Sequence, residues 1–222
     1  VASDRHASNP DQAVHAFCHA LPARWIQMAV TLSATTSLGW LARICRADDV
    51  AGFAGSAERV DIERAPLFLP YLNGERTPHN DAKATGLFHG LTSATDAADL
   101  AYAVMEGVAF SLADGHAALT AAGTPVDEAI ALGGGSNSSA WLKLVAASAG
   151  IRLIRAEGGD RGGAFGAARL AMLAAGEGDI DAVCQPPGIA EVIEPDPVLA
   201  QRLLPRLARY RQLYPLTKAL QP

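Results

Sequence analysis

An alternation of short apolar strands and amphipathic helices between residues 128 and 175 most limits the folds that this chain can adopt. Glu128–Leu132 and Ile151–Ala156 have the length and composition of buried strands, and each is followed by a helical stretch, Ser138–Ala149 and Gly162–Ala175. Strands separated by helices at this spacing pair in parallel through right-handed crossovers. We therefore predict an α/β domain.

The residues before this unit predict additional strands and helices. β-Branched, aromatic and small residues on either side of a turn-like Leu21-Pro22-Ala23 indicate a two-stranded hairpin. Turn formers and charges after Asn73-Gly74 indicate a surface loop that continues to Lys83. In chain order we expect strands at 13–18 and 25–31, helices at 33–46 and 48–59, an apolar run at 67–72, the loop, and a short strand at 86–91.

A long amphipathic helix is predicted from Asp96 to about Gly123. Its apolar side chains recur every four residues, at Leu100, Val104, Val108 and Leu112, and this spacing places them on one face. Thr95 or Asp96 can cap its first turn. We expect the Leu100 to Leu112 face to be core.

The last part of the chain, residues 179–222, is predicted to be a connector followed by a helix. Four prolines, Pro186, Pro187, Pro195 and Pro197, indicate the connector. The helix is expected around 199–214, and Pro205 should interrupt or kink it because proline lacks the backbone N–H that a helix interior needs.

Charge and composition narrow the classes of partner. The formal net charge of the 222 residues is -5, with no long run of Lys or Arg, which argues against nucleic acid and anionic membranes and favours a small ligand. No apolar run reaches about 18 residues, and the polar start does not resemble a signal peptide. The three cysteines form no CxxC pair, as expected of reduced thiols. We expect a cytoplasmic protein without a membrane span.

A glycine turn, Gly133-Gly134-Gly135, lies between the first predicted strand and helix of the α/β unit. Glycines there let backbone N–H groups approach a phosphate or a ribose, although a tight turn also favours glycine for steric reasons. A dinucleotide site, G-x-G-x-x-G with an acid about 20 residues on, is met only in part by Gly133, Gly135 and Glu157, because Ser138 stands at the third glycine. Both readings stay open at this point.

Residues outside the turn resemble a known family. Gly86–Leu91 (GLFHGL), a seven-residue gap and Asp99–Glu106 (DLAYAVME) resemble the C-terminal signature of the FGGY carbohydrate kinases. Leu69–His79 (LPYLNGERTPH) looks like the stretch that distinguishes the xylulokinase branch of that family, and so does His15–His19 before Trp25. The resemblance covers nearly the whole chain and weakens only in the first dozen residues and the proline-rich tail.

The resemblance implies an actin-like ATPase, ribonuclease H-like fold of two domains, of which residues 1–222 are the C-terminal, nucleotide-binding one. ATP and the sugar would meet between the domains, with Mg²⁺ as cofactor. By similarity, Gly134 and Gly135 should approach the ATP phosphates and ribose, Ser139 the adenosine end, and Gly90 should line the nucleotide cleft. At Asn137 the family often has arginine, which leaves no side-chain role to carry over there.

The same resemblance implies that the chemistry needs a second half. In the family, an aspartate of the N-terminal domain takes the proton from the sugar hydroxyl, and a Gly-Thr-Ser-Gly-like loop holds the phosphates; neither occurs in this chain. We therefore expect no catalytic residue here, and a parent enzyme that phosphorylates a ketose, D-xylulose being the expected one, while this chain alone is inactive. The alternatives are a non-catalytic actin-like module that binds nucleotide or forms a homodimer, and the dinucleotide fold.

Three further groups of polar residues have plainer explanations than catalysis. His15, Cys18 and His19 could suggest zinc, but neighbouring side chains of a strand point to opposite faces, so we expect no metal site. Glu75-Arg76 is expected to be an ion pair or loop brace in a solvated segment. Glu106 is expected to brace a neighbouring loop from the flank of its helix.

Overall fold

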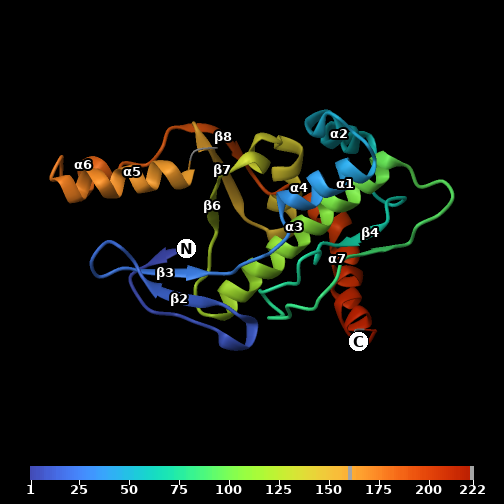
Figure 1. Ribbon diagram of the computed structural model, residues 1–222, viewed down its shortest axis with the longest axis horizontal. Helices are drawn as coiled ribbons and strands as arrows, with labels where there is room; N and C mark the ends of the chain where they lie inside the picture. The colour runs from blue at the N-terminus through green and yellow to red at the C-terminus, as the bar shows by residue number, and fades with distance from the viewer. Residues whose placement is uncertain (160–161, 221–222) are drawn as a thin grey trace.

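The computed structural model describes residues 1–159 and 162–220, which form a mixed α/β structure with a long helix at its centre (Figure 1). The α/β class predicted from the sequence is confirmed. The α-helices are α1 (Thr35–Ile44), α2 (Val50–Ser56), α3 (Ala97–Ala121), α4 (Ser139–Ala149), α5 (Gly162–Ala175), α6 (Ile180–Val183) and α7 (Pro197–Lys218), and short 3₁₀ helices are η1 (Pro10–Gln12), η2 (Ala57–Arg59) and η3 (Gly134–Asn137). The strands are β1 (Ala2–Ser3), β2 (His15–Cys18), β3 (Trp25–Met28), β4 (Leu67–Leu69), β5 (Leu87–His89), β6 (Glu128–Ala131), β7 (Arg152–Ala156) and β8 (Ile189–Ile193).

The N-terminal strands form an antiparallel sheet in the order β1-β3-β2. The predicted hairpin is confirmed, since β2 and β3 pair antiparallel from His15 opposite Met28 to Cys18 opposite Trp25. β1 pairs with the other side of β3, with Ala2 opposite Ile26.

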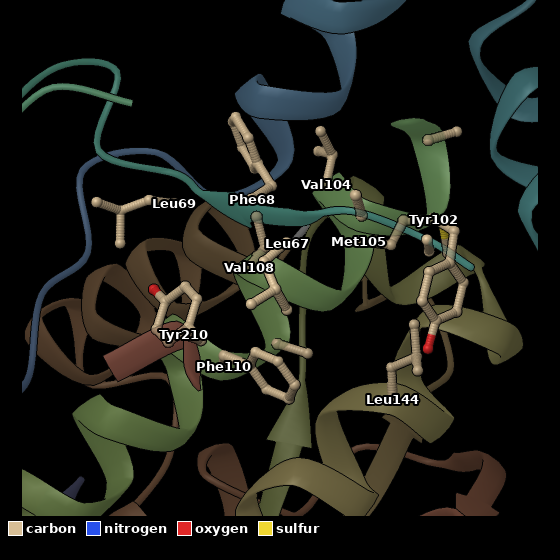
Figure 2. Packing of buried hydrophobic residues seen from close by; sticks show 14 of the residues in the cluster. Leu67, Phe68, Leu69, Tyr102, Val104, Met105, Val108, Phe110, Leu144 and Tyr210 are labelled. Atoms are coloured by element: carbon tan, nitrogen blue, oxygen red, sulfur yellow. The ribbon is translucent and has the colours of Figure 1, made fainter. Parts of the chain in front are cut away.

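Helix α3 is the element around which the core is built. Asp96 and Asp99 form a capping box at its start, which satisfies the free N–H groups of the first turn and confirms Asp96 as the cap. α3 then packs against β4, where Gly107 lets the helix approach closely: a Cβ at this position would lie 2.2 Å from the carbonyl oxygen of Phe68. Figure 2 shows side chains of β4 and α3 packed with Leu144 of α4 and Tyr210 of α7.

The predicted core face of α3 is only partly buried. Val104 and Val108 are buried, but Leu112 is 37% exposed, and so the expectation that the whole Leu100 to Leu112 face is core was wrong. Leu112 lies at a cavity beside the N-terminal sheet instead.

A buried ion pair joins α3 to α7. Arg206 donates to both carboxylate oxygens of Glu106, through Nε at 2.6 Å and a terminal nitrogen at 2.7 Å, and also to the carbonyl oxygens of Ala65 and Pro66. Glu106 was expected at a helix flank against a neighbouring loop, but it is fully buried, and its partner is 100 residues away. The pair therefore fixes the C-terminal helix to the centre of the fold.

The third sheet has the order β6-β7-β8 and mixes two strand directions. The predicted parallel pairing of β6 and β7 is confirmed, with Ile130 opposite Ile154. β8 adds antiparallel to β7, so the prediction that this region is only a connector was wrong. The four prolines lie outside Ile189–Ile193, and they bound a strand whose β-branched residues suit a sheet.

Helix α7 continues through Pro205 and Pro215 from Pro197 to Lys218, so the predicted interruption at Pro205 does not occur. Buried contacts on either side of this proline, at Leu203, Arg206, Leu207 and Tyr210, explain why tertiary packing outweighs its unfavourable helix propensity. Among residues 1–159 and 162–220, no helix is both long and apolar enough to cross a membrane.

Candidate functional site

The glycine turn begins where β6 ends. Gly133 has a φ of 86°, a backbone conformation that is strained for residues with a side chain. The backbone conformation alone therefore explains why this position of the turn is a glycine. The carbonyl oxygen of Gly133 accepts hydrogen bonds from the backbone N–H and the hydroxyl of Ser136, at 3.0 and 2.7 Å. The turn leads directly into η3 and then α4.

A second glycine turn lies beside the first. Gly158, with a φ of 61°, and Gly159 follow β7, and the N–H of Gly133 donates to the carbonyl oxygen of Gly159 at 3.1 Å. Because β6 and β7 are parallel, their carboxyl ends meet at one edge of the sheet, the usual position of ligand sites in α/β folds. The sequence-based prediction did not include Gly158 and Gly159, although a glycine pair directly after a predicted strand was a signal for them.

At Gly134 and Gly135 the backbone conformation does not require a glycine, in contrast to Gly133. Gly134 is not among the glycines with positive φ, and apart from its two chain neighbours no described residue has an atom within 4 Å of the position that a Cβ would take. At Gly135 a Cβ would be 3.4 Å from the hydroxyl oxygen of Thr35, an ordinary contact. Neither backbone strain nor crowding within the described chain therefore explains Gly134.

Thr35 connects the turn to a second helix start. It is the first residue of α1, whose preceding residue, Ala34, makes no side-chain capping hydrogen bond. The first N–H groups of a helix have no partner within it, and they carry a partial positive charge. The starts of α1 and of η3 thus meet at Gly135, which only the tertiary structure could reveal, because Thr35 and Gly135 are 100 positions apart.

The serines after the turn have different roles. Ser138 caps α4 by accepting a hydrogen bond from the N–H of Trp141 at 3.2 Å. The hydroxyl of Ser139 donates to Glu191 of β8 at 2.8 Å, and Arg155 contacts the same carboxylate oxygen at 2.9 Å. The expected contact of Ser139 with adenosine stays a prediction, and its hydroxyl hydrogen is engaged within the chain.

Gly90 lies elsewhere in the fold. It follows β5, which pairs with β4 in a separate two-stranded sheet, and it is exposed with a φ of 87°. Its positive φ is a sufficient reason for glycine there. Of the four expected nucleotide-binding residues, Gly134 and Gly135 lie in η3 and Ser139 at the start of α4, while a place for Gly90 along the nucleotide cleft stays a prediction.

The segment from Glu75 to Lys83 is less exposed than its charges predicted. Glu75 is 1% exposed, and its carboxylate accepts hydrogen bonds from the hydroxyls of Thr31 and Ser111 and from the N–H groups of Leu32 and Arg76. The expected surface loop holds for Arg76, Asn80 and Lys83, which are exposed, but not for Glu75, which is buried and forms the expected loop brace. Burial raises the pKa of Glu75, and these hydrogen bonds oppose that shift.

His79 of the same segment packs against aromatic rings. Its ring lies 3.7 Å from that of Tyr214, centroid to centroid, in a stacked arrangement, and its Nε2 is 3.0 Å from the hydroxyl oxygen of Tyr71. Burial lowers the pKa of His79 to about 4, so the ring is neutral near pH 7.

An apolar cavity of about 430 Å³ adjoins the glycine turn at Gly135 and Ser136. Most of its lining is alkyl side chains from α3, α4 and β6, with few polar groups. A nucleotide needs donors for its phosphates, and these are offered by the turn at the end of the cavity and not by its walls.

The dinucleotide reading fits this geometry poorly. Its acid, Glu157, lies with its carboxylate against Gly188, in the segment that leads to β8, and not over the turn. β8 is antiparallel, whereas a dinucleotide-binding unit continues with a third parallel strand.

Comparisons with known proteins identify the family of the chain. The model of the FGGY family of carbohydrate kinases, C-terminal domain, matches residues 5–175. Xylulose kinase of Escherichia coli (strain K12) is 44% identical over 176 residues, which cover 79% of this chain and 36% of the relative. Xylulose kinase of Klebsiella pneumoniae is 39% identical over 222 residues, covering 99% and 46%.

A solved structure, a xyloylose kinase from Brucella ovis, superposes with a TM-score of 0.91 at 43% identity, covering 99% of this chain and 46% of that chain. The chain thus spans less than half the length of each of these relatives.

Proposed function

Because the chain belongs to the FGGY family of carbohydrate kinases through its C-terminal domain, we propose that it is the nucleotide-binding part of an ATP-dependent ketose kinase. D-xylulose is the proposed substrate, since the similar curated proteins are named xylulose kinases. The product would be D-xylulose 5-phosphate.

The observation that carries this proposal is the open space at Gly134. Gly39 in α1 has the same open space, so the space alone does not mark a site; at Gly134 it lies at the carboxyl edge of the β6–β7 sheet, where a ligand can approach the backbone. The N–H groups of Gly134 and Gly135 lie at the start of η3, where a helix leaves its first donors free. Such donors, together with the start of α1, suit a polyphosphate.

When bound, Mg-ATP supplies the phosphoryl group, and the metal neutralises its charge. The role of this chain is to position the nucleotide. Gly134 and Gly135 would donate backbone hydrogen bonds to phosphate oxygens, while Ser138 fixes the start of α4 behind them. Glu191, which also pairs with Arg155, accepts a hydrogen bond from Ser139 and so holds the first residue of α4 in place. Positioning of this kind accounts for much of the catalysis in phosphoryl transfer.

We assign no catalytic residue to this chain. The group that accepts the proton of the sugar hydroxyl, and most of the sugar site, are proposed to lie in the part of the kinase that this chain does not span. The chain alone is therefore expected to bind ADP weakly and to transfer no phosphate.

A chimera tests this proposal: the chain replaces the matching 46% of the Brucella ovis relative. Its phosphorylation of D-xylulose and its binding of ADP with Mg²⁺ are measured beside those of the chain alone. Gly134→Ala should weaken ADP binding at least about tenfold, since a single methyl blocks close approach of the phosphates. Gly39→Ala is the matched control, because a Cβ there also meets no described atom within 4 Å.

Three results would contradict the proposal. The first is absence of ADP binding by the chimera, and the second is an unchanged affinity in Gly134→Ala. The third is phosphorylation of D-xylulose by the chain alone, which would place the chemistry within these residues. Binding of ADP without turnover by the chimera would instead support the non-catalytic nucleotide-binding module, and binding of NAD in place of ADP the dinucleotide site.

A further inference from the structure

Hydrogen bonds from a distant segment hold residues 30–33, which connect β3 to α1 (Figure 1). The N–H of Val30 donates to the hydroxyl oxygen of Thr77 at 2.8 Å, and the N–H of Thr77 donates to the carbonyl oxygen of Val30 at 2.9 Å. The side-chain amide of Asn73 donates to the hydroxyl oxygen of Ser33 at 3.2 Å. Both ends of the connection are therefore held by partners that lie 40 or more positions further along the chain.

The carboxylate of Glu75 lies between these two ends. One of its oxygens accepts hydrogen bonds from the N–H groups of Leu32, at 3.1 Å, and Arg76, at 2.7 Å. The other oxygen accepts hydrogen bonds from the hydroxyls of Thr31, at 2.8 Å, and Ser111 of α3, at 3.4 Å. Glu75 thus ties the connection between β3 and α1 to the central helix of the fold.

Stability alone does not explain a carboxylate at this position. Glu75 is 1% exposed, and burying a carboxylate costs free energy that its hydrogen bonds must offset. Replacing both partners of a buried hydrogen bond by apolar groups of the same shape can be nearly neutral. A polar network whose members are all paired does more than apolar packing, because it rigidifies its surroundings and specifies one arrangement. The carboxylate therefore indicates that the connection must keep one defined position.

The connection leads directly into the start of α1, which lies at the glycine turn. A Cβ at Gly135 would be 3.4 Å from the hydroxyl oxygen of Thr35, the first residue of α1. Ala34 provides no side-chain cap, so no capping side chain fixes this helix start. The hydroxyl of Ser37 instead donates to the carbonyl oxygen of Ser33 at 2.8 Å. The first turn of α1 is thereby attached to the residues that the distant segment holds.

We propose that Glu75 is a positioning residue for the nucleotide. Its carboxylate sets the path of the connection through Thr31 and Leu32, and so holds the start of α1 against the glycine turn. The free N–H groups of α1 and of η3 then face the same phosphates of ATP. This inference rests on the proposed function, because it assigns the start of α1 to the same nucleotide site.

Substitutions of Glu75 in the chimera with the Brucella ovis relative test this role. Glu75→Ala removes the acceptor of four donors and should raise the Kd for Mg-ADP and the KM for ATP at least about tenfold, because a displaced helix start meets the phosphates poorly. The KM for D-xylulose should change by less than about twofold, since the sugar site is proposed to lie in the other part of the kinase. Glu75→Gln should recover most of the lost affinity, because an amide can accept from the N–H groups and donate to the hydroxyls.

A matched pair of milder variants separates positioning from stability. Thr31→Val and Tyr102→Phe each remove one hydroxyl that donates to a buried carboxylate, in the second case Glu106 at 3.2 Å. Both should lower the free energy of unfolding to a similar extent. Thr31→Val should raise the Kd for Mg-ADP about threefold or more, because only its carboxylate holds the connection to α1. Tyr102→Phe should leave this Kd unchanged.

Hydrogen exchange of the chain without nucleotide measures the connection itself. In Glu75→Ala the amide of Leu32 should exchange at least about tenfold faster, since it loses its acceptor, while the amides of α4 should be unaffected. If Glu75→Ala does not fold, the comparison of Thr31→Val with Tyr102→Phe decides the question by itself.

Four results would overturn the proposal: an unchanged Kd for Mg-ADP in folded Glu75→Ala, no recovery in Glu75→Gln, equal effects of Thr31→Val and Tyr102→Phe on this Kd, or a KM for D-xylulose that rises as much as the KM for ATP. If the chimera with unsubstituted Glu75 binds ADP and any of these results is found, only the role of Glu75 is wrong. If that chimera binds no ADP, the proposed function is wrong and the role of Glu75 with it.

Discussion

Replacing Arg206 with methionine should destabilise this protein more than any exposed charge substitution. Methionine resembles the apolar stem of arginine but carries no guanidinium, so Glu106 would lose both of its charged hydrogen bonds. The side chain of Glu106 is only 1% exposed, and without Arg206 it would keep the hydrogen bond that the hydroxyl of Tyr102 donates at 3.2 Å. The carbonyl oxygens of Ala65 and Pro66 would also lose a donor.

The magnitude follows from this burial. Removing one partner of a buried ion pair costs about 3–5 kcal/mol, because the other charge stays buried without compensation. Glu106 can escape part of that cost by binding a proton. Burial already raises its pKa while Arg206 opposes the shift, and loss of Arg206 should raise it further.

The variant should therefore depend on pH in a defined direction. Between the ordinary pKa of 4.5 and the raised pKa of folded Arg206→Met, the folded state holds a proton at Glu106 that the unfolded state has lost. Stability must then fall as the pH rises, by up to about 1.4 kcal/mol per pH unit. The deficit relative to the unsubstituted protein should be smaller at pH 5 than at pH 8.

Urea unfolding followed by far-ultraviolet circular dichroism measures these differences. The double variant Glu106→Leu/Arg206→Met should recover much of the loss, because two apolar side chains can replace a buried pair at little cost. Arg152→Met is the surface control: Arg152 pairs with Glu128 at 3.0 Å, but both side chains are nearly half exposed, so its cost should be at most about 1 kcal/mol.

A loss below about 1 kcal/mol for Arg206→Met at pH 7 would refute the reasoning. So would a double variant that is as unstable as the single one, because the unpaired carboxylate could then not be the cause.

Three further predictions concern the rest of the core. Gly107→Ala should destabilise the folded protein by about 1–3 kcal/mol or more, since its Cβ would meet the carbonyl oxygen of Phe68. Gly39→Ala, in open space within α1, should stabilise it by up to about 1 kcal/mol, and equal effects of the two variants in urea unfolding would contradict the close approach at Gly107. Burial raises the pKa of Glu75, so its contribution to stability should be largest below about pH 4.5 and fall as the pH rises; Glu75→Gln should flatten that slope, and an unchanged slope would exclude this carboxylate as its cause. An NMR titration should find a pKa of about 4 for His79, and a value of 6 or above would mean that its ring is solvated.

Local patterns in the sequence were sufficient to predict most of the helices and strands. The four-residue spacing and Asp96 predicted α3, and the strand-glycine-helix order predicted β6, the glycine turn and α4, because caps, turns and amphipathic faces are encoded within a few neighbouring residues. β8 was missed because the prolines around it dominated the local pattern, while its partner, β7, lies more than 30 residues earlier. The glycine turn was likewise found from the sequence, but its neighbours Thr35 and Gly159 were not.

The sequence by itself determined the family and the glycine turn, since both depend on residue types at short, fixed spacings. Only the tertiary structure decided which charges are buried and which apolar residues are not. Glu106 and Glu75 are ordinary acids in the sequence, and their burial depends on donors that packing brings from distant segments. Leu112 and Ile130 are ordinary core residues in the sequence, yet they are 37% and 48% exposed in the structure. Burial is a property of what surrounds a side chain, and most of those surroundings lie far along the chain.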